Sequence, residues 1–202
     1  MLRWLADLVA PSRCAACDLE SSLLFCDGCA ATTERATSTE AAFLYGGAIA
    51  EAIVRLKYGK RSDLAGRLGE AMGEWAPRGI DIVVPVPLHP LRAAERGFNQ
   101  SALLARPVAR RLGVPLGARV LARTRHTPRQ AVLDRATRYM NVESAFRCRD
   151  PRAVRGKSVL LVDDVRTTGA TLRECRAALT AGGAREIAHY VLAIRDELPE
   201  SR

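Results

Sequence analysis

The sequence predicts an α/β protein with an open, mainly parallel β-sheet flanked by helices. Two segments, 80–87 and 158–162, are largely apolar and show no polar alternation, as expected of strands buried on both faces, and the first of them is rich in β-branched residues. Segments with helical periodicity separate the predicted strands, and this alternation is typical of a parallel sheet with right-handed crossovers. At 202 residues, the chain is long enough for one such domain and a small appendage.

The first half of the predicted body runs strand, helix, helix, strand. Residues 42–45 form a short strand, and in residues 48–58 the apolar side chains recur at helical spacing. Asp63 is expected to cap a second helix that runs to about residue 76. The buried strand at 80–87 follows this pair of helices.

The second half continues the alternation of helices and strands. Residues 99–112 have a helical pattern, in which Pro107 marks a kink or a break. The elements expected next are a strand at 114–122, an Arg-rich polar segment at 123–130, a helix at 131–139 and a short strand at 145–148. The buried strand at 158–162 is followed by a helix at 170–179, which ends before Gly182 and Gly183, and by a last strand at 186–194.

The amino-terminal residues 1–10 lie outside this body. Their apolar residues recur at helical spacing and predict a short docking helix, with a helix on the membrane surface as the alternative. No transmembrane helix is predicted, because the longest apolar run, at 82–88, contains two prolines and falls far short of the roughly 20 residues that cross a bilayer.

Four of the six cysteines form two closely spaced pairs, Cys14-x2-Cys17 and Cys26-x2-Cys29. Two such turns supply four thiolates, the ligand set of a tetrahedral zinc site, whereas a redox dithiol normally uses one pair. Because all four ligands are cysteines, no coordination position is left open, and the zinc is expected to be structural. Four thiolates also imply a reducing compartment, which predicts a cytoplasmic protein.

The cysteine module predicts a division of the chain into two folded parts. Residues 1–32 contain the amino-terminal helix and the four cysteines, residues 33–41 form a hinge, and residues 42–202 form the main domain. The hinge is rich in Thr, Ala and Ser and poor in large apolar residues. Cys148 and Cys175 stand alone and are expected to fill the core of the main domain.

The residues that carry chemistry lie in the run VLLVDDVRTTGAT at 159–171. Ligands of open α/β sheets bind at the carboxyl edge, to which the buried strand delivers Asp163 and Asp164. Residues 167–171 form a loop that opens a helix, so that its backbone N–H groups and hydroxyls suit a phosphate. The two carboxylates can accept from vicinal hydroxyls, directly or through Mg²⁺. One loop is therefore expected to hold a phosphate and a sugar diol together.

This run closely resembles the phosphoribosyl-pyrophosphate (PRPP) loop of type I phosphoribosyltransferases. The resemblance implies the fold of these enzymes, to which the four cysteines add a small amino-terminal zinc ribbon or knuckle. It also implies that Asp163 and Asp164 hold the ribose hydroxyls of Mg²⁺-bound PRPP. It further implies a cradle for the 5-phosphate formed by Val165, Thr167, Thr168, Gly169, Ala170 and Thr171. Receiver domains and haloacid-dehalogenase-like enzymes share the Asp pair but lack the Thr-rich cradle, and no Gly-x4-Gly-Lys-Ser/Thr loop is present.

Further motifs make the resemblance more specific, to a single family. They are Leu56-Lys57-Tyr58, Pro85-Val86-Pro87-Leu88-His89, Arg96-Gly97-Phe98-Asn99-Gln100, Arg123-x-Arg125-x-Thr127-x-x-Gln130, Arg138-x-x-Asn141-Val142 and Ala145-Phe146. Together with Arg92 and the four-cysteine module, they look like the ComF family of competence-associated proteins. The resemblance covers nearly the whole chain and implies an association with natural transformation and DNA uptake, with a helicase-like ATPase as a partner.

The resemblance also assigns residues to the pyrophosphate end of PRPP. Leu88 and His89 fall in the turn that holds pyrophosphate in type I phosphoribosyltransferases. Arg92 and Arg96 would then clamp phosphate, the alternative being a solvated surface.

A second group of residues is expected to close over the substrate. Arg123, Arg125 and Gln130 fall where the family resemblance places a mobile loop, with a role toward pyrophosphate or the acceptor. Lys57 is a further candidate near the site.

The chain is basic, and its charge is unevenly spread. Lys and Arg number 31 against 22 Asp and Glu, a formal charge of +9, which excludes an acidic solvating protein and favours phosphate-rich partners. Residues 88–157 contain sixteen cations and four acids, more positive charge than a pyrophosphate site needs. Single-stranded DNA is therefore a candidate partner, bound mainly through its phosphates because this segment has few aromatic residues.

Two functions are open from the sequence. The first is an enzyme that transfers the phosphoribosyl group from PRPP to a nitrogen nucleophile with Mg²⁺. The second is a non-catalytic competence factor that senses PRPP and uses a basic face to bind single-stranded DNA and a helicase-like partner. The acceptor is unspecified, because after Phe146 the only aromatic residue is Tyr190, which leaves no obvious ring to stack on a base.

Overall fold

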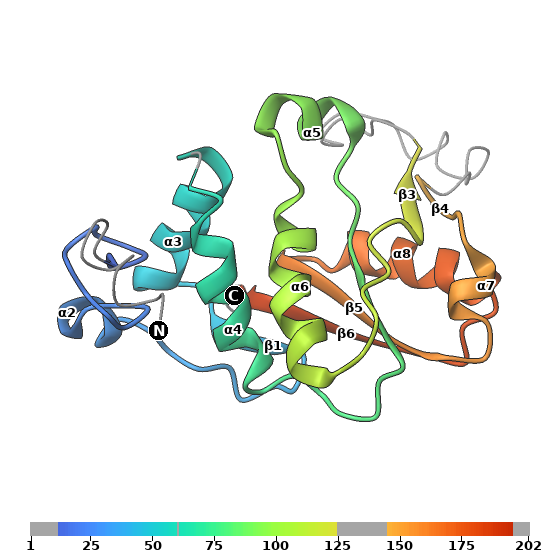
Figure 1. Cartoon of the computed structure of the whole chain (residues 1–202), viewed down its shortest axis with the longest axis horizontal. Helices are drawn as coiled ribbons and strands as arrows, with labels where there is room; N and C mark the ends of the chain where they lie inside the picture. Colours follow the sequence, from blue (N-terminus) through green and yellow to red (C-terminus); the bar gives the residue numbers. More distant parts are fainter. Residues whose placement is uncertain (1–11, 60, 125–144, 196–202) are drawn as a thin grey trace, which may run out of the picture.

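Four parallel strands form the central sheet of the protein (Figure 1). The computed structural model describes residues 12–59, 61–124 and 145–195. The sheet order in this part of the chain is β1-β6-β5-β2, with β1 (Ala41–Leu44), β6 (Glu186–Ile194), β5 (Ser158–Arg166) and β2 (Ile82–Pro85). Each neighbouring pair of strands runs parallel. The predicted α/β fold with an open parallel sheet is therefore confirmed.

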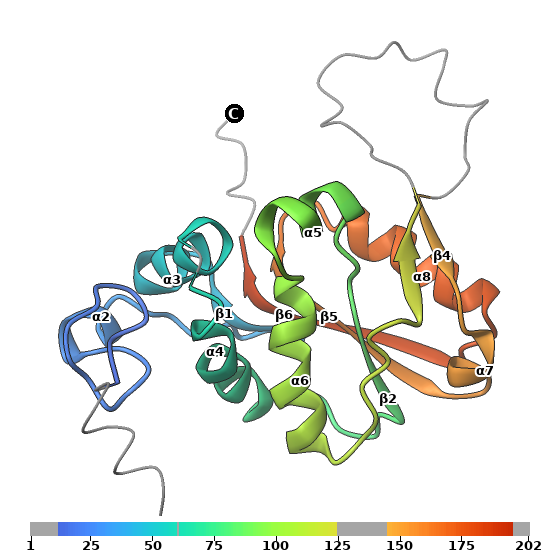
Figure 2. The same ribbon diagram turned by 45° about the horizontal axis from the view of Figure 1, so that its top comes forward.

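Helices cover the two faces of the sheet unequally. On one face lie α3 (Gly47–Tyr58), α4 (Leu64–Gly73) and α6 (Gln100–Leu112), and on the other lies α8 (Ala170–Ala181), as Figures 1 and 2 show. The shorter helices are α2 (Asp27–Ala30), α5 (Pro90–Arg96) and α7 (Pro151–Val154). A separate antiparallel pair, β3 (Leu121–Arg123) and β4 (Phe146–Cys148), packs against α8.

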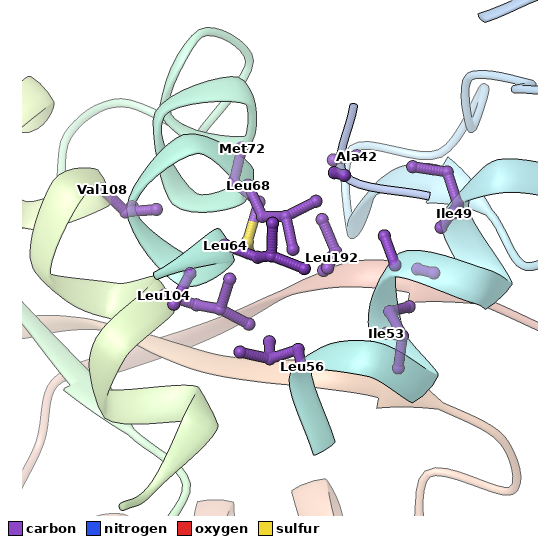
Figure 3. Close-up of a cluster of buried hydrophobic side chains, with 14 of the residues drawn as sticks. Ala42, Ile49, Ile53, Leu56, Leu64, Leu68, Met72, Leu104, Val108 and Leu192 are labelled. Atoms are coloured by element: carbon purple, nitrogen blue, oxygen red, sulfur yellow. The ribbon is translucent and has the colours of Figure 1, made fainter. Parts of the chain in front are cut away.

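The alternation of side chains along β5 explains its unbroken apolar sequence. Leu160 and Val162 belong to the buried cluster beneath α3, α4 and α6, where Figure 3 shows Leu56, Leu64 and other apolar side chains converging. Val159 and Leu161 belong to a second buried cluster, which faces α8. Both faces of this strand are therefore buried, as the sequence predicts.

The close approach of α4 and α6 depends on a glycine. A Cβ atom on Gly69 would lie 2.6 Å from the carbonyl oxygen of Leu104 and 2.9 Å from a ring carbon of Pro107. Pro107 lies inside a continuous α6, so the helix is not broken there. The two helices thus pack backbone against backbone at this point.

The four-cysteine module packs directly on the main body. Cys14 and Phe25 are buried in the same cluster as the side chains of α3 and α4. Arg55 of α3 donates to the carbonyl of Ala16 over 2.8 Å and forms an ion pair with Asp18. The module is therefore held to α3 by apolar packing and by charge together.

Short segments of chain bind to both edges of the sheet. At the β1 edge, Arg35 forms an antiparallel bridge with Phe43. At the β2 edge, Leu116 forms a parallel bridge with Val83. The first of these segments belongs to 33–41, the expected hinge, whose role as a domain boundary stays a prediction.

Several boundaries differ from the sequence-based expectation. Helix α4 ends at Gly73, and Asp63 makes no side-chain capping bond because its carboxylate pairs with Arg61 over 2.8 Å. The strand expected at 114–122 is reduced to β3, whereas β5 continues four residues past its expected end at 162. The helices expected at 1–10 and 131–139 lie outside the described residues. Where the structure describes the chain, no helix is long and apolar enough to cross a membrane.

We expect Gly66→Ala and Gly69→Ala, both within α4, to change stability in opposite directions. Gly66 has open space where a Cβ atom would lie, so alanine gains helix propensity worth about 1 kcal/mol. Gly69→Ala pushes a methyl group against the Leu104 carbonyl and should cost roughly 1 to 3 kcal/mol. Urea unfolding of the two variants measures both changes, and equal effects would contradict the close helix contact.

Candidate functional site

The candidate site lies at the carboxyl edge of the sheet, where β2 ends and β5 continues. The backbone N–H of Val86 donates to the carbonyl of Val162 over 2.8 Å. Beyond this bond β5 carries Asp163 and Asp164 past the end of β2, still paired with β6. Side chains from the end of α3 and the start of α6 reach the same carboxylates. Four elements therefore converge on the Asp pair.

Asp164 is a buried carboxylate paired with a lysine. Its exposed fraction is 4%, and its Oδ2 lies 2.8 Å from Nζ of Lys57 on α3. Its Oδ1 accepts from the backbone N–H of Val165 over 2.7 Å. Because an unpaired buried charge is strongly destabilising, this ion pair ties the end of α3 to β5. The structure thus places Lys57, a candidate from the sequence, in contact with the Asp pair.

Asp163 is held by the first turn of α6. Oγ of Ser101 donates to Oδ1 of Asp163 over 2.7 Å, and the backbone N–H of Asp164 binds the same oxygen over 2.9 Å. Asn99 caps α6 by accepting from the Ser101 N–H over 3.1 Å, and its amide donates to the Val86 carbonyl over 3.0 Å. Among the described residues nothing binds Oδ2 of Asp163, so this oxygen is available to a ligand.

The pKa of Asp163 is raised by its surroundings. Burial, and next the negative charge of Asp164, raise the pKa of Asp163 to about 7, while Ser101 and Lys57 act in the opposite direction. Asp163 therefore ionises less readily than an exposed carboxyl group. A cation or a pair of hydroxyl donors at Oδ2 would favour its ionised form.

The threonine loop joins β5 to α8. Gly169 directly precedes α8 and has a φ of 71°. Residues with a side chain rarely adopt this left-handed backbone conformation. Oγ1 of Thr168 accepts from the Ala170 N–H over 3.4 Å, and Arg173 donates to the Thr168 carbonyl over 2.7 Å. Because the first N–H groups of a helix lack intrahelical acceptors, the segment from Thr167 to Thr171 retains donors for an anion. Its role as a phosphate cradle stays a prediction.

The segment after β2 forms a helix that sequence analysis missed. Leu88 and His89 lead into α5, where Nδ1 of His89 accepts from the Leu91 N–H over 3.3 Å. Pro90 occupies the first turn, and Gly97 follows the last turn with a φ of 82°. Proline at the start and glycine just past the end are helix signals, so the sequence contained the information that predicts α5.

The two arginines predicted to clamp phosphate, Arg92 and Arg96, lie in different surroundings in the structure. Nη1 of Arg96 donates to the Gln100 side chain over 2.6 Å, and its guanidinium lies 5.4 Å from the ring centre of Tyr58, the residue after Lys57. Arg92 is exposed on α5. Arg96 therefore lies beside the end of α3 that reaches the Asp pair, whereas no contact with the site is found for Arg92 in the described part of the chain.

The loop predicted to close over substrate is described only at its start. Arg123 ends β3, with its guanidinium 5.4 Å from the ring centre of Phe146. Arg125 and Gln130 lie outside the described residues. Their roles stay predictions.

Comparison with known families agrees with this geometry. The family described as "Phosphoribosyl transferase domain" matches residues 99–201, a stretch that contains the Asn99 cap, the Asp pair and the threonine loop. The chain belongs to the phosphoribosyltransferase domain family. A structure of glutamine PRPP amidotransferase from B. subtilis, complexed with ADP and GMP, has a TM-score of 0.50 and 22% identity, covering 68% of this chain and 30% of that one. This likeness shows the fold of this phosphoribosyltransferase domain protein.

The curated relatives are competence and DNA utilization proteins. DNA utilization protein YhgH of Escherichia coli (strain K12) is 36% identical over 69% of this chain and 64% of its own length. Competence protein F of Haemophilus influenzae is 36% identical over 56% of this chain and 50% of its own length. ComFC of Bacillus subtilis is 33% identical over 55% and 43%. The chain thus spans less than two thirds of these relatives, and the predicted ComF membership with a phosphoribosyltransferase fold is confirmed.

The four cysteines of this phosphoribosyltransferase domain protein form one cluster that fits a metal. Their sulfur atoms all lie within 4.8 Å of one another, and those of Cys17 and Cys26 are 3.7 Å apart. Tetrahedral zinc with Zn–S bonds of about 2.3 Å places its sulfurs about 3.8 Å apart. Burial raises the pKa of Cys14, but backbone hydrogen bonds from Cys17, Cys26 and Ala16 outweigh it and lower the pKa to about 6. The donor set and its spacing suit structural zinc.

One residue of the site had no role in the sequence analysis. Ser101 directly follows the quoted motif that ends in Gln100, and only its contact with Asp163 shows what it does. Asn99 followed by a helical pattern is a recognisable N-cap signal. The signal predicts where α6 starts, but it does not predict which strand that first turn meets.

We expect Asp163→Asn to stabilise the ligand-free protein most at high pH. Because folding raises this pKa from 3.8 to about 7, the stability that the group contributes is present below about pH 4 and is lost as pH rises through 7. Asparagine does not ionise and still accepts from Ser101, so the gain at about pH 8 is on the order of a few kcal/mol.

Thermal unfolding between about pH 5 and pH 8 measures this gain. Glu51→Gln, which removes an exposed carboxylate from α3, is the control and should show no such pH dependence. An Asp163→Asn gain that stays constant over this range would contradict the raised pKa.

Proposed function

We propose that the chain binds PRPP with Mg²⁺ at the carboxyl edge of the sheet and transfers its phosphoribosyl group to a nitrogen nucleophile. The main support is the arrangement at the end of β5, where Lys57 and Ser101 hold a buried Asp pair and the threonine loop follows at the start of α8. PRPP has a sugar diol and a 5-phosphate on one ring, which match these two neighbouring features. Because the chain belongs to a competence-associated family, we place this activity in DNA uptake.

The proposed reaction exchanges one bond at C1 of the ribose. The bond from C1 to the pyrophosphate oxygen breaks, and pyrophosphate leaves with the electron pair. A bond from C1 to the acceptor nitrogen forms, and that nitrogen then loses one proton. Positive charge develops on the ribose in between, and in this proposal the carboxylates of Asp163 and Asp164 stabilise it.

The residues at this edge have separate tasks in the proposal. Lys57 orients Asp164, and Ser101 leaves Oδ2 of Asp163 open to the ribose hydroxyls or to Mg²⁺, for which carboxylate oxygens are suitable ligands. Bound Mg²⁺ would neutralise charge on the pyrophosphate. Arg96, which lies beside Tyr58 at the end of α3, is the residue that we propose for contact with the pyrophosphate. Tyr58, 73% exposed beside Arg96, offers the stacking ring for an acceptor that the sequence analysis did not find.

We expect Mg²⁺-PRPP to raise the melting temperature of the protein. At about 100 times its dissociation constant, a ligand adds roughly 2.7 kcal/mol, or about 5 to 11 °C for a chain of this size. The double variant Asp163→Asn, Asp164→Asn should lose this shift because its neutral amides lack the negative charge with which the carboxylates would bind the ribose hydroxyls or Mg²⁺. Differential scanning fluorimetry with and without Mg²⁺-PRPP makes the comparison.

The matched control removes the same charge from the exposed side of α4 and from the residue that follows this helix. Glu70→Gln with Glu74→Gln changes two exposed acids and should leave the shift intact. An unshifted wild-type protein in millimolar Mg²⁺-PRPP would refute the proposed site. Pyrophosphate release across a panel of amines, bases and DNA then separates a transferase from a PRPP sensor.

A second function, binding of single-stranded DNA, is favoured by one observation. Nine arginines of the basic segment 88–157 are exposed and form no ion pair among the described residues. They are Arg92, Arg106, Arg110, Arg111, Arg119, Arg147, Arg149, Arg152 and Arg155. In this alternative the chain is a non-catalytic competence factor, and a helicase-like partner is proposed from the ComF resemblance alone.

We expect Arg149→Glu to weaken binding of a fluorescent oligo-dT strand. Each lost phosphate contact should flatten the plot of log affinity against log salt by about 0.7. Arg78→Glu reverses an equally exposed charge outside the basic segment and serves as the control. Fluorescence anisotropy over a salt series measures both slopes, and identical behaviour of the two variants would remove this surface from the DNA hypothesis.

A further inference from the structure

A second concave site lies on the α8 side of the sheet. It has a volume of about 400 Å³, and its base is apolar, with Leu161 from β5, Ile187 from β6 and Leu172 from α8. The threonine loop forms part of its wall through Thr167 and Gly169. Neither carboxylate of the Asp pair lines this hollow, which we call the α8 pocket.

Four arginines and one histidine surround the α8 pocket. They are Arg166, Arg173, Arg176, Arg195 and His189. Four guanidinium groups around one hollow of this size form a strong anion-binding environment, because each is charged at any physiological pH and presents several donors. The proposed PRPP site uses none of these five side chains.

One acid opposes this charge. Glu40 lies 2.6 Å from Nη1 of Arg166 and 3.4 Å from Nε2 of His189. Burial lowers the pKa of His189, and Arg166 and Arg176 lower it further, against the opposing effect of Glu40. With a neutral histidine, the four arginines exceed this single carboxylate by three charges.

The other three arginines of the α8 pocket differ in the contacts that they make. Arg173 donates to the Thr168 carbonyl over 2.7 Å, and the Arg195 guanidinium lies 4.7 Å from the ring centre of Tyr45. Arg176 is exposed and forms no hydrogen bond or ion pair within the described residues. It is the guanidinium most open to a ligand.

The volume and the lining of the α8 pocket suit a ligand larger than an inorganic anion. Its volume falls within the range of about 300 to 1,000 Å³ typical of small-molecule sites. A neighbouring hollow shares Ile194 and Arg195 with it and is lined by Tyr45. The apolar floor of the pocket, the flat guanidinium groups and the nearby aromatic ring suit a planar nucleobase. The arginine cluster suits a phosphate.

We propose that the α8 pocket binds a nucleoside phosphate at a site separate from that of PRPP. The phosphate meets Arg166, Arg173 and Arg176, and the base lies over the apolar residues toward Arg195. A ligand there contacts the threonine loop from the α8 side of the sheet. Occupancy of this pocket does not depend on whether the chain binds PRPP or catalyses transfer.

The test compares two charge reversals on helices. Isothermal titration with AMP should give binding that Arg176→Glu weakens at least about tenfold, the usual worth of one charge-assisted contact. Arg106→Glu reverses an equally exposed arginine of α6 and should leave the affinity unchanged. Equal affinity of both variants for AMP, or no binding by the wild type at millimolar AMP, would overturn the proposal.

Two further arms identify which part of the ligand is recognised. Adenosine and inorganic phosphate should each bind at least about tenfold more weakly than AMP, because each lacks one half of the proposed contacts. Inorganic phosphate that binds as tightly as AMP would overturn the nucleoside assignment.

Competition with PRPP distinguishes the two sites. AMP binding in saturating Mg²⁺-PRPP should persist and should keep its dependence on Arg176. Complete displacement of AMP by PRPP would place AMP in the PRPP site and overturn the proposal. If PRPP fails to bind while AMP binding depends on Arg176, the proposed enzyme function fails and the α8 pocket stands.

Discussion

The buried ion pair between Lys57 and Asp164 connects the parts of this molecule. Asp164 is nearly inaccessible to water, so its charge needs a partner that the fold holds in place. That partner lies on α3, and Arg55 of the same helix binds the four-cysteine module. The position of α3 in turn depends on its packing with α4 and α6 in the shared core. One helix therefore links the four-cysteine module, the core and the candidate site.

The features best predicted from the sequence were those marked by a regular pattern, such as a run of apolar residues or a fixed spacing of cysteines. The strands β2 and β5 were found because burial on both faces demands largely apolar runs, and the four-cysteine cluster because its spacing fits a metal. Helix α5 was missed although Pro90 and Gly97 mark its ends, since it is only seven residues long and buries none of its side chains. The contact between Ser101 and Asp163 was not predictable, because it depends on how α6 meets β5 across 62 positions of sequence. Local patterns specify elements, and packing specifies which of them meet.

Two groups of arginines in this chain have different surroundings. Among the described residues, those of segment 88–157 are spread over α5, α6, the β3–β4 pair and the region of α7, and most of them are exposed. Those around the α8 pocket converge on one hollow with an apolar base. Dispersed charge favours a long, sequence-independent polyanion, whereas converging charge favours a single small anion. The sequence analysis detected the first group by counting, but the second becomes visible only when β5, β6 and α8 are brought together.

The bridges at the two sheet edges have a consequence for the solution behaviour of the chain. An uncovered edge strand presents free N–H and C=O groups that can recruit a strand from another molecule. Here β1 is only four residues long and is partly covered by the segment around Arg35, and Leu116 occupies part of the β2 edge. Both outer strands thus offer few free backbone groups to a second copy. The fold is thereby protected against edge-to-edge aggregation while the carboxyl end of its sheet stays open for ligands.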